Sequence, residues 1–203
     1  AYWVNGDTGL KQTTEINWAN KYLNIEEIAV ILPVPDNVIA DAEMNIWDEA
    51  MPYMTEAVGR TLDSAIFFGT NAPASFPTAI YTNLDSAGND YTEGTNNAAA
   101  GGYMADLDGA LALLEADGYE ADAIVAHTSF KGMLRAARAS DGQRLDVGRV
   151  AGDLSAVDGI TATYPMRGLW STASGAPRAI LLQRDQFVLG IRSDISFKLF
   201  TEG

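Results

Sequence analysis

Residues 34–80, VPDNVIADAEMNIWDEAMPYMTEAVGRTLDSAIFFGTNAPASFPTAI, contain the longest helical pattern in this chain of 203 residues. Apolar and small side chains recur there at three- and four-residue steps and form one stripe: Ile46, Trp47, Ala50, Met51, Met54, Ala57, Val58, Thr61, Leu62, Ala65 and Ile66. Charged residues such as Glu49 and Asp63 fall on or near the other face. This spacing predicts an amphipathic helix with one buried side.

The end of this helix is marked by Gly69, and Pro73 and Pro77 prevent it from restarting. Roughly twenty-odd residues at 1.5 Å each predict a rod about 35 Å long, longer than the helix of an average domain. Pro52 lies inside the pattern and removes one backbone donor, which predicts a kink there or the start of a straight portion nearby. We interpret this helix as the spine of the fold.

The composition excludes several functional classes. The chain has no cysteine, which excludes disulfides, thiolate nucleophiles and zinc–thiolate sites. The net charge of −14 argues against sequence-specific nucleic-acid binding, because phosphate contacts need clustered Lys and Arg. A solubilising acidic surface is the simpler interpretation. The sequence has no long apolar run, and its N-terminus lacks a basic region followed by an apolar one. It therefore predicts a soluble protein without a secretory signal or a membrane partner.

The first part of the chain, residues 1–32, reads as extended. Asn5-Gly6-Asp7 indicates a tight turn, and the β-branched run from Ile28 to Leu32, closed by Pro33, predicts a strand. Asp36 is expected to cap a short helix over residues 37–40, and Asp41 is expected to cap the helix that follows.

Residues 70–100 are poor in bulky aliphatic side chains and rich in Gly, Asn, Ser and Thr. This composition predicts a surface loop or loose hairpin, mobile from Asp85 to Asn97, at the boundary between two structural units.

The second half of the chain mixes helices and strands. Helices are predicted over residues 103–117 and after a cap at Thr128 or Ser129, where Phe130, Met133, Leu134 and Ala137 share one face. Strands are predicted over residues 121–126, 159–165, 178–183 and 187–200. The order indicates a mixed α/β unit, and the whole chain is expected to be an α+β protein.

A search for catalytic and binding motifs yields no catalytic, cofactor-binding or metal-binding residue. The single histidine, His127, stands near Ser129, but neighbours at a strand-to-helix junction are expected to point apart, so we interpret His127 as turn-stabilising. The loop with Asp85, Asn89, Asp90 and Glu93 fails the calcium pattern, because Ala87 takes a ligand position and Asn96 the twelfth place.

Two further groups have simple interpretations. Glu115, Asp117, Glu120 and Asp122 surround a helix end and are interpreted as a solvated acidic patch. Gly101-Gly102 precedes a helix, but no Lys-Ser/Thr pair follows, so a phosphate loop is not indicated.

The order of the elements resembles the core of tailed-phage major capsid proteins, the Hong Kong 97-like family. The segment KYLNIEEIAVILPVP (21–35) resembles the family's strand before its spine helix, and IFFG (66–69) resembles the end of that helix. Residues 76–80 and 159–165 resemble later steps of the family, although Thr78-Ala79 stands where glycine is usual. AILLQRDQFVLGIRSDISFK (179–198) resembles its late strand and turn.

The resemblance implies a division of the chain. Residues 1–18 are expected to be the returning half of an extended loop, the E-loop. Residues 19–80 are expected to form a peripheral domain with the spine helix, residues 81–190 an axial α/β domain, and residues 191–203 the return to the peripheral domain. Family members carry an N-terminal arm before this region and peripheral strands after it, so the resemblance implies a truncated or proteolysed core with unpaired strand edges.

The function implied by the resemblance is a structural, non-enzymatic role. The chain is expected to assemble with itself, as pentamers and hexamers, into an icosahedral head enclosing double-stranded DNA. Scaffold, maturation protease and portal are the other partners implied, with no cofactor, assembly in the host cytoplasm and final location in the virion. Lys11 is interpreted as an ordinary solvated lysine of the arm.

Two alternatives remain open from the sequence. An encapsulin-type nanocompartment shares the fold and would offer a docking pocket for a cargo peptide. A small α/β hydrolase or ligand-binding module would instead use the loop from Asp85 to Glu93 and form a deep pocket with convergent polar groups.

The stripe of the long helix yields one test. Leu62→Asp should lower the free energy of unfolding by several kcal/mol, because it places a charge in an apolar stripe. Urea unfolding of the variant and the parent protein measures this difference. A fully exposed Leu62 in a structure of an assembled particle would contradict the prediction.

Overall fold

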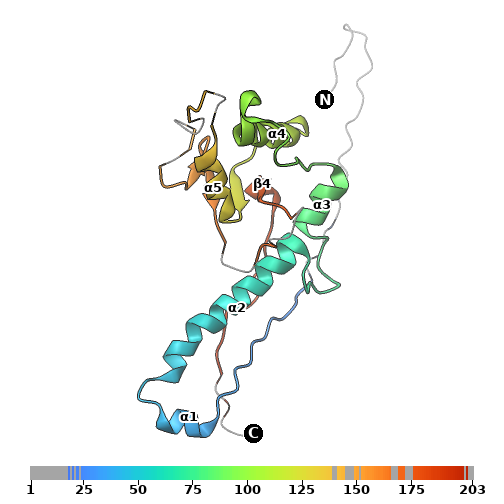
Figure 1. Ribbon diagram of the computed structural model, residues 1–203. Coiled ribbons are helices and arrows are strands. Elements are labelled where there is room, and N and C mark those ends of the chain that lie inside the picture. The colour runs from blue at the N-terminus through green and yellow to red at the C-terminus, as the bar shows by residue number, and fades with distance from the viewer. Residues whose placement is uncertain are drawn as a thin grey trace, which may run out of the picture.

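A computed structural model of the chain describes residues 18, 20, 22, 24–138, 141–144, 149–150, 152–165, 169–171, 176–198 and 200. A long helix, α2, runs obliquely away from a unit of sheet and helices (Figure 1). The expected E-loop half at residues 1–18 and Lys11 lie outside the described residues, apart from Trp18.

The long helix α2 spans Ile46–Phe68, 23 residues, which confirms the predicted spine. It ends at Gly69, whose φ of 67° is left-handed and whose amide N–H bonds back to the carbonyl of Ala65. The helix continues through Pro52. Asn45, and not Asp41, caps its start, because the Asn45 side chain accepts the backbone N–H of Trp47 at 3.1 Å.

Two short helices flank α2. Before it, α1 spans Asp36–Asp41, close to the predicted short helix, with Pro35 at the cap position. After it, α3 spans Ile80–Ala87, so the prediction of a loop throughout residues 70–100 was wrong. The reason is tertiary packing, since Ile80, Tyr81 and Leu84 pack against the aromatic side chains at the end of α2.

The sheet has four strands in the order β2-β3-β1-β4. β1 (Ala123–Ala126) runs parallel to β3 (Ile160–Thr163) and antiparallel to β4 (Ala179–Leu182). β2 (Ala156–Val157) joins β3 through a two-residue hairpin turn, Asp158-Gly159, in which both φ angles are positive, 51° and 81°. The strands predicted over residues 121–126, 159–165 and 178–183 are therefore confirmed, with ends that differ by at most two residues.

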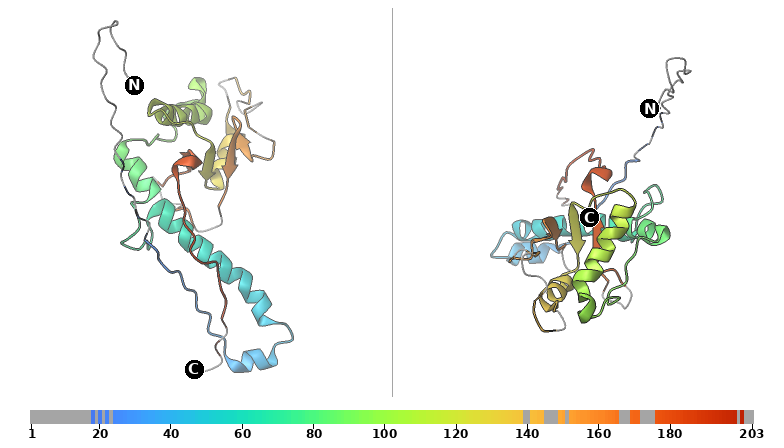
Figure 2. Two further views of the ribbon diagram at one scale, coloured as in Figure 1. Left: turned by 180° about the vertical axis from the view of Figure 1, so that it is seen from behind. Right: turned by 90° about the horizontal axis from the view of Figure 1, so that it is seen from above.

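Helices cover one face of this sheet. α4 (Gly102–Ala116) and α5 (Ser129–Ala136) occupy the predicted positions, and short 3₁₀ turns span Ala98–Ala100 and Arg184–Gln186. We call α4, α5 and the four strands the sheet unit. Figures 1 and 2 show α4 and α5 side by side over the sheet, with α3 on the other flank.

Alternation along the strands separates two cores. On one face Ile124, Ala126, Val157 and Ala162 pack against α4 and α5, and Leu134 at 1% exposure lies at the centre. On the other face Ile180, with Val125 and Leu182, packs against a second cluster that contains Trp170 and the end of α2. β1 and β4 are thus covered on both sides, by the helices of the sheet unit and by the tip of α2, while Thr161 and Thr163 of β3 are exposed.

Two predicted strands are not paired. Residues 24–35 and 187–198 are extended, but neither belongs to a strand in the described part of the chain. The predictions of a strand at Ile28–Leu32 and of a long strand or pair of strands over residues 187–200 were therefore wrong in pairing, although residues 28–32 and 187–198 are extended. A strand requires a neighbour, and the described chain supplies none at these positions.

The first core yields a stability prediction. Leu134→Ala should lower the free energy of unfolding by about 2–5 kcal/mol, because it leaves a cavity among well-packed side chains. Leu189→Ala, at a leucine that is 61% exposed, is the matched control and should change it by about 0.5 kcal/mol or less. Urea titration followed by circular dichroism measures both, and equal losses in the two variants would contradict the placement of Leu134.

Candidate functional site

The exposed surface around α2 is the most unusual feature of the molecule. Of the 23 residues of α2, only Ala65 is buried, and the stripe that includes Met54 and Leu62 is half-buried. Amphipathic helices normally bury such a stripe against the rest of the fold. This chain therefore leaves its longest helix incompletely covered.

Two extended segments accompany α2 (Figures 1 and 2). The segment 187–198 touches the start of the helix, where the Phe197 ring meets Trp47 edge-on at 5.9 Å. The segment 24–35 is held beyond the C-terminal end of α2, where the Ser75 hydroxyl donates a hydrogen bond to Glu26. Their backbones lack ladder partners among the described residues, so both present free donors and acceptors.

The same region exposes large apolar side chains. Ile31 is 88% exposed, Val188 78% and Ile191 75%. We call the exposed apolar residues of α2, of the turn before it and of the two segments the apolar band. Its members are Ile25, Ile28, Ile31, Leu32, Met44, Tyr53, Phe187, Val188, Leu189, Ile191 and Ile195. Soluble monomers rarely expose so much large apolar surface in one region, so the band is a surface that the described residues leave uncovered.

A groove of about 1040 Å³ separates α2 from the sheet. Its mostly apolar walls include Gly59 and Phe67 of α2, Val125 and Leu182 of the sheet, and Leu189 of the C-terminal segment. Asp63 also lines the groove, and its burial there raises the pKa of the carboxyl group above the ordinary aspartate value. Asp63, which the sequence places on or near the exposed face of the helix, is thus half-buried.

His127 and Ser129, expected to point apart, are in contact. The Nδ1 atom of His127 lies 2.8 Å from the Ser129 hydroxyl and accepts the Ser129 backbone N–H at 3.2 Å. No carboxylate completes a triad with them among the contacts of the described residues. The histidine ring therefore satisfies the first turn of α5, in agreement with a turn-stabilising role, while Thr128 holds the cap position without a side-chain bond.

The predicted acidic groups are divided among several contacts. Glu93 pairs with Arg178 at 3.4 Å, and Asp122 pairs with Arg184 at 3.4 Å and accepts its backbone N–H. Asp122 is therefore paired with Arg184 and does not belong to the solvated acidic patch that the sequence predicts. Across the described residues no group of three or more His, Cys, Asp or Glu side chains is arranged to hold a metal ion. Likewise, no described helix is long and apolar enough to cross a membrane.

A buried carboxylate that the sequence reasoning missed organises residues 88–101. Asp106, 7% exposed in α4, accepts the backbone N–H groups of Gly94 at 2.7 Å and Asn96 at 2.9 Å, and the Asn96 amide at 2.9 Å. These hydrogen bonds hold the middle of the loop against α4. The available signal was an aspartate inside the apolar stripe of the helix, which must find donors when buried.

The Gly101-Gly102 pair also serves this loop. Both glycines have positive φ, 101° and 54°, and the Gly102 N–H donates to the Asn97 carbonyl at 2.8 Å. Tyr91 packs so closely on Gly109 of α4 that a Cβ there would overlap the ring. The loop therefore lies flat on α4.

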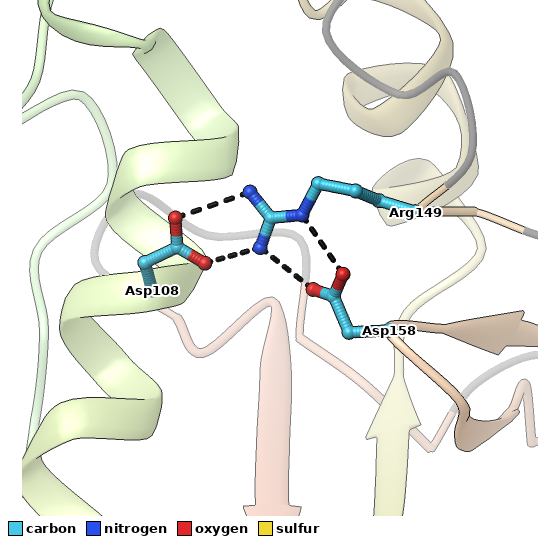
Figure 3. Close-up of polar contacts among 3 residues, drawn as sticks. All are labelled: Asp108, Arg149 and Asp158. Atoms are coloured by element: carbon cyan, nitrogen blue, oxygen red, sulfur yellow. Dashed lines mark hydrogen bonds and ion pairs between the residues drawn. The ribbon is translucent and has the colours of Figure 1, made fainter.

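One arginine joins α4 to the β2–β3 hairpin (Figure 3). The Arg149 guanidinium donates to both oxygens of Asp158, at 2.8 and 2.7 Å, and to both oxygens of Asp108, with Nη1 at 3.1 Å from one of them. Hydrogen bonds to Asp158 and then to Asp108 raise the pKa of Arg149 above its ordinary value, so the group stays charged. These four hydrogen bonds fix the β2–β3 hairpin against α4.

An incompletely covered long helix, two unpaired extended segments and an exposed apolar band distinguish this chain from a closed monomeric domain. A family model described as the phage capsid family matches residues 1–200, and the chain belongs to this family. The expected α+β, Hong Kong 97-like capsid fold is confirmed, and the nanocompartment and hydrolase alternatives are not favoured.

Solved phage structures agree with this assignment. A structure from Mycobacterium phage Bobi aligns with a TM-score of 0.74 and 28% identity, over 89% of this chain and 59% of that one. One from Microbacterium phage Oxtober96 gives 0.72 and 32% identity, over 84% and 58%. One from Mycobacterium phage Adephagia gives 0.71 and 26%, over 89% and 58%. This chain therefore spans less than two thirds of these structures, and no curated protein matches it.

Asp63 yields a pH prediction. Because its pKa is raised in the folded state, its ionised form destabilises the fold above that pKa, and this cost vanishes below the unfolded value of about 3.9, where both states are protonated. Asp63→Asn should therefore raise the melting temperature at pH 7 more than at pH 3. Thermal unfolding at both pH values measures the difference, and equal shifts would contradict the assigned cause.

Proposed function

We propose that this chain is the shell-building subunit of a tailed-phage head, which assembles with itself as pentamers and hexamers into an icosahedral shell around double-stranded DNA. The observation that carries the proposal is the apolar band along α2 and its two extended segments, in a chain of the phage capsid family. Burial of such side chains between copies provides a driving force of about 25 cal/mol per Å² of apolar surface.

The proposed division follows the arrangement of elements. Residues 19–80 form the peripheral domain around α2, residues 81–190 the axial domain around the sheet, and residues 191–203 return to the periphery. Residues 1–18 form the returning half of the E-loop. Such an arrangement combines a rigid strut with arms that pair across subunit boundaries.

The proposed role is structural and not enzymatic. The net charge of −14 would keep packaged DNA from adhering to the shell, so the chain makes no sequence-specific nucleic-acid contact. Scaffold, maturation protease and portal are the proposed transient partners, and assembly takes place in the host cytoplasm before the subunit becomes part of the virion.

A charge in the apolar band tests this proposal. Ile31→Asp should leave the thermal stability of the unassembled chain unchanged within about 0.5 kcal/mol, because the side chain is 88% exposed, yet should reduce assembly strongly. Ile31→Val, which keeps the apolar surface, is the matched control and should assemble normally.

Electron microscopy of the protein expressed alone provides the measurement. Closed shells, pentamers or hexamers of the unsubstituted protein and of Ile31→Val, with few for Ile31→Asp, are expected. A protein that stays monomeric at all concentrations would contradict the proposal.

A further inference from the structure

Negative charge gathers at one end of the sheet unit. The exposed carboxylates at the C-terminal ends of α3 and α4, which we call the acidic surface, are Asp85, Asp90, Glu115, Asp117 and Glu120. The two helix ends are tied together, because the Asn89 amide donates to Asp117 at 2.8 Å. The carboxylates therefore lie on one continuous part of the unit.

This acidic surface is electrostatically unfavourable in the isolated chain. A helix C-terminus carries a partial negative charge and is stabilised by a cation, yet neither α3 nor α4 has a basic residue in its last turn. No ion pair involves any of the five carboxylates in the part of the chain that the structure describes. A cation from outside the chain would relieve this repulsion.

Positive charge gathers on α5 and on Arg138, two residues beyond its end, and we call Arg135 and Arg138 the α5 arginines. Arg135 and Arg138 are both exposed, and Arg135 makes no ion pair with any described carboxylate. Arg138 donates to the carbonyl oxygens of Arg135 and Ala137, at 2.8 and 3.0 Å, so its charge is held near the end of the helix. Lys131 adds a third cation one turn earlier, stacked 4.1 Å from the centre of the Tyr164 ring and near Asp153.

These two surfaces lie on opposite flanks of the same unit. The N-terminal half of α4, at Met104 and Leu107, packs against Phe130 and Leu134 of α5. The acidic surface lies at the other end of α4, where Glu115 is eight residues, or about 12 Å, beyond Leu107. Figures 1 and 2 accordingly show α5 and α3 on opposite sides of the sheet unit.

We propose that the α5 arginines of one copy dock on the acidic surface of the next copy, head to tail, and so close a ring of sheet units. Two different complementary surfaces on opposite flanks are what a heterologous, ring-forming contact requires. The inference rests on the proposed shell function and specifies which part of each copy meets its neighbour. Because the chain carries 27 acidic and 13 basic side chains, the scarce arginines also select the orientation of the contact.

Charge reversal and its compensation test the proposed contact. In the full chain, Arg135→Glu alone, or Glu115→Lys with Glu120→Lys, should weaken association about tenfold or more, because each places like charges in contact. The triple variant with all three substitutions should recover association to within about threefold of the unsubstituted chain. Arg135→Lys keeps the charge and is the matched control.

Sedimentation velocity at about 50 and 500 mM salt provides the readout, since the Debye length shortens from roughly 14 to 4 Å over that range. Circular dichroism of each variant verifies folding. Association that is unaffected by Arg135→Glu, or not recovered in the triple variant, would overturn this inference while leaving the shell function intact. An unsubstituted chain that never associates would overturn the shell function and this inference together.

Discussion

The contact on which the rest of the structure depends is the aromatic junction between the tip of α2 and the sheet. The Phe68 ring meets Trp170 edge-on at 5.1 Å and Tyr81 at 6.2 Å, and Ile180 of β4 closes the cluster from the sheet side. Edge-to-face pairs of this kind add about 0.5–1.5 kcal/mol to the free energy gained by burial. Because the rest of α2 is only partly covered, this junction sets the direction of the whole helix.

The junction also explains why the two halves of the chain differ so much in burial. The sheet unit has a closed core between β1 and its helices, while α2 and its two accompanying segments leave apolar side chains and backbone groups unpartnered. A chain that served only as a monomer would gain from burying the band. Its exposure agrees with the proposed assembly of this chain with copies of itself.

Much of the fold was predictable from local pattern. The helices α2, α4 and α5 have long or regular apolar stripes and clear stop signals, and β1 is a compact apolar run. The eight residues of α3 were missed, because Thr82, Asn83 and Ser86 resemble a loop and only contact with Phe68 and its neighbours stabilises the helix. The pairing of residues 28–32 was mispredicted, because propensity describes extension and says nothing of a partner strand. The apolar band could not be predicted, because a sequence does not record which side chains are exposed. The Asp106 contacts could not be predicted either, because their donors lie ten and twelve residues away.

The length of α2 has a mechanical consequence. α2 has 23 residues and is about 35 Å long. It is held chiefly at one end, so a change in the Phe68–Trp170 contact rotates the whole helix about that point. A rotation of about 5° there displaces the far end by about 3 Å, roughly two residues of helical rise. A small repacking of the Phe68–Trp170 pair would therefore displace α1 by several ångströms relative to the sheet.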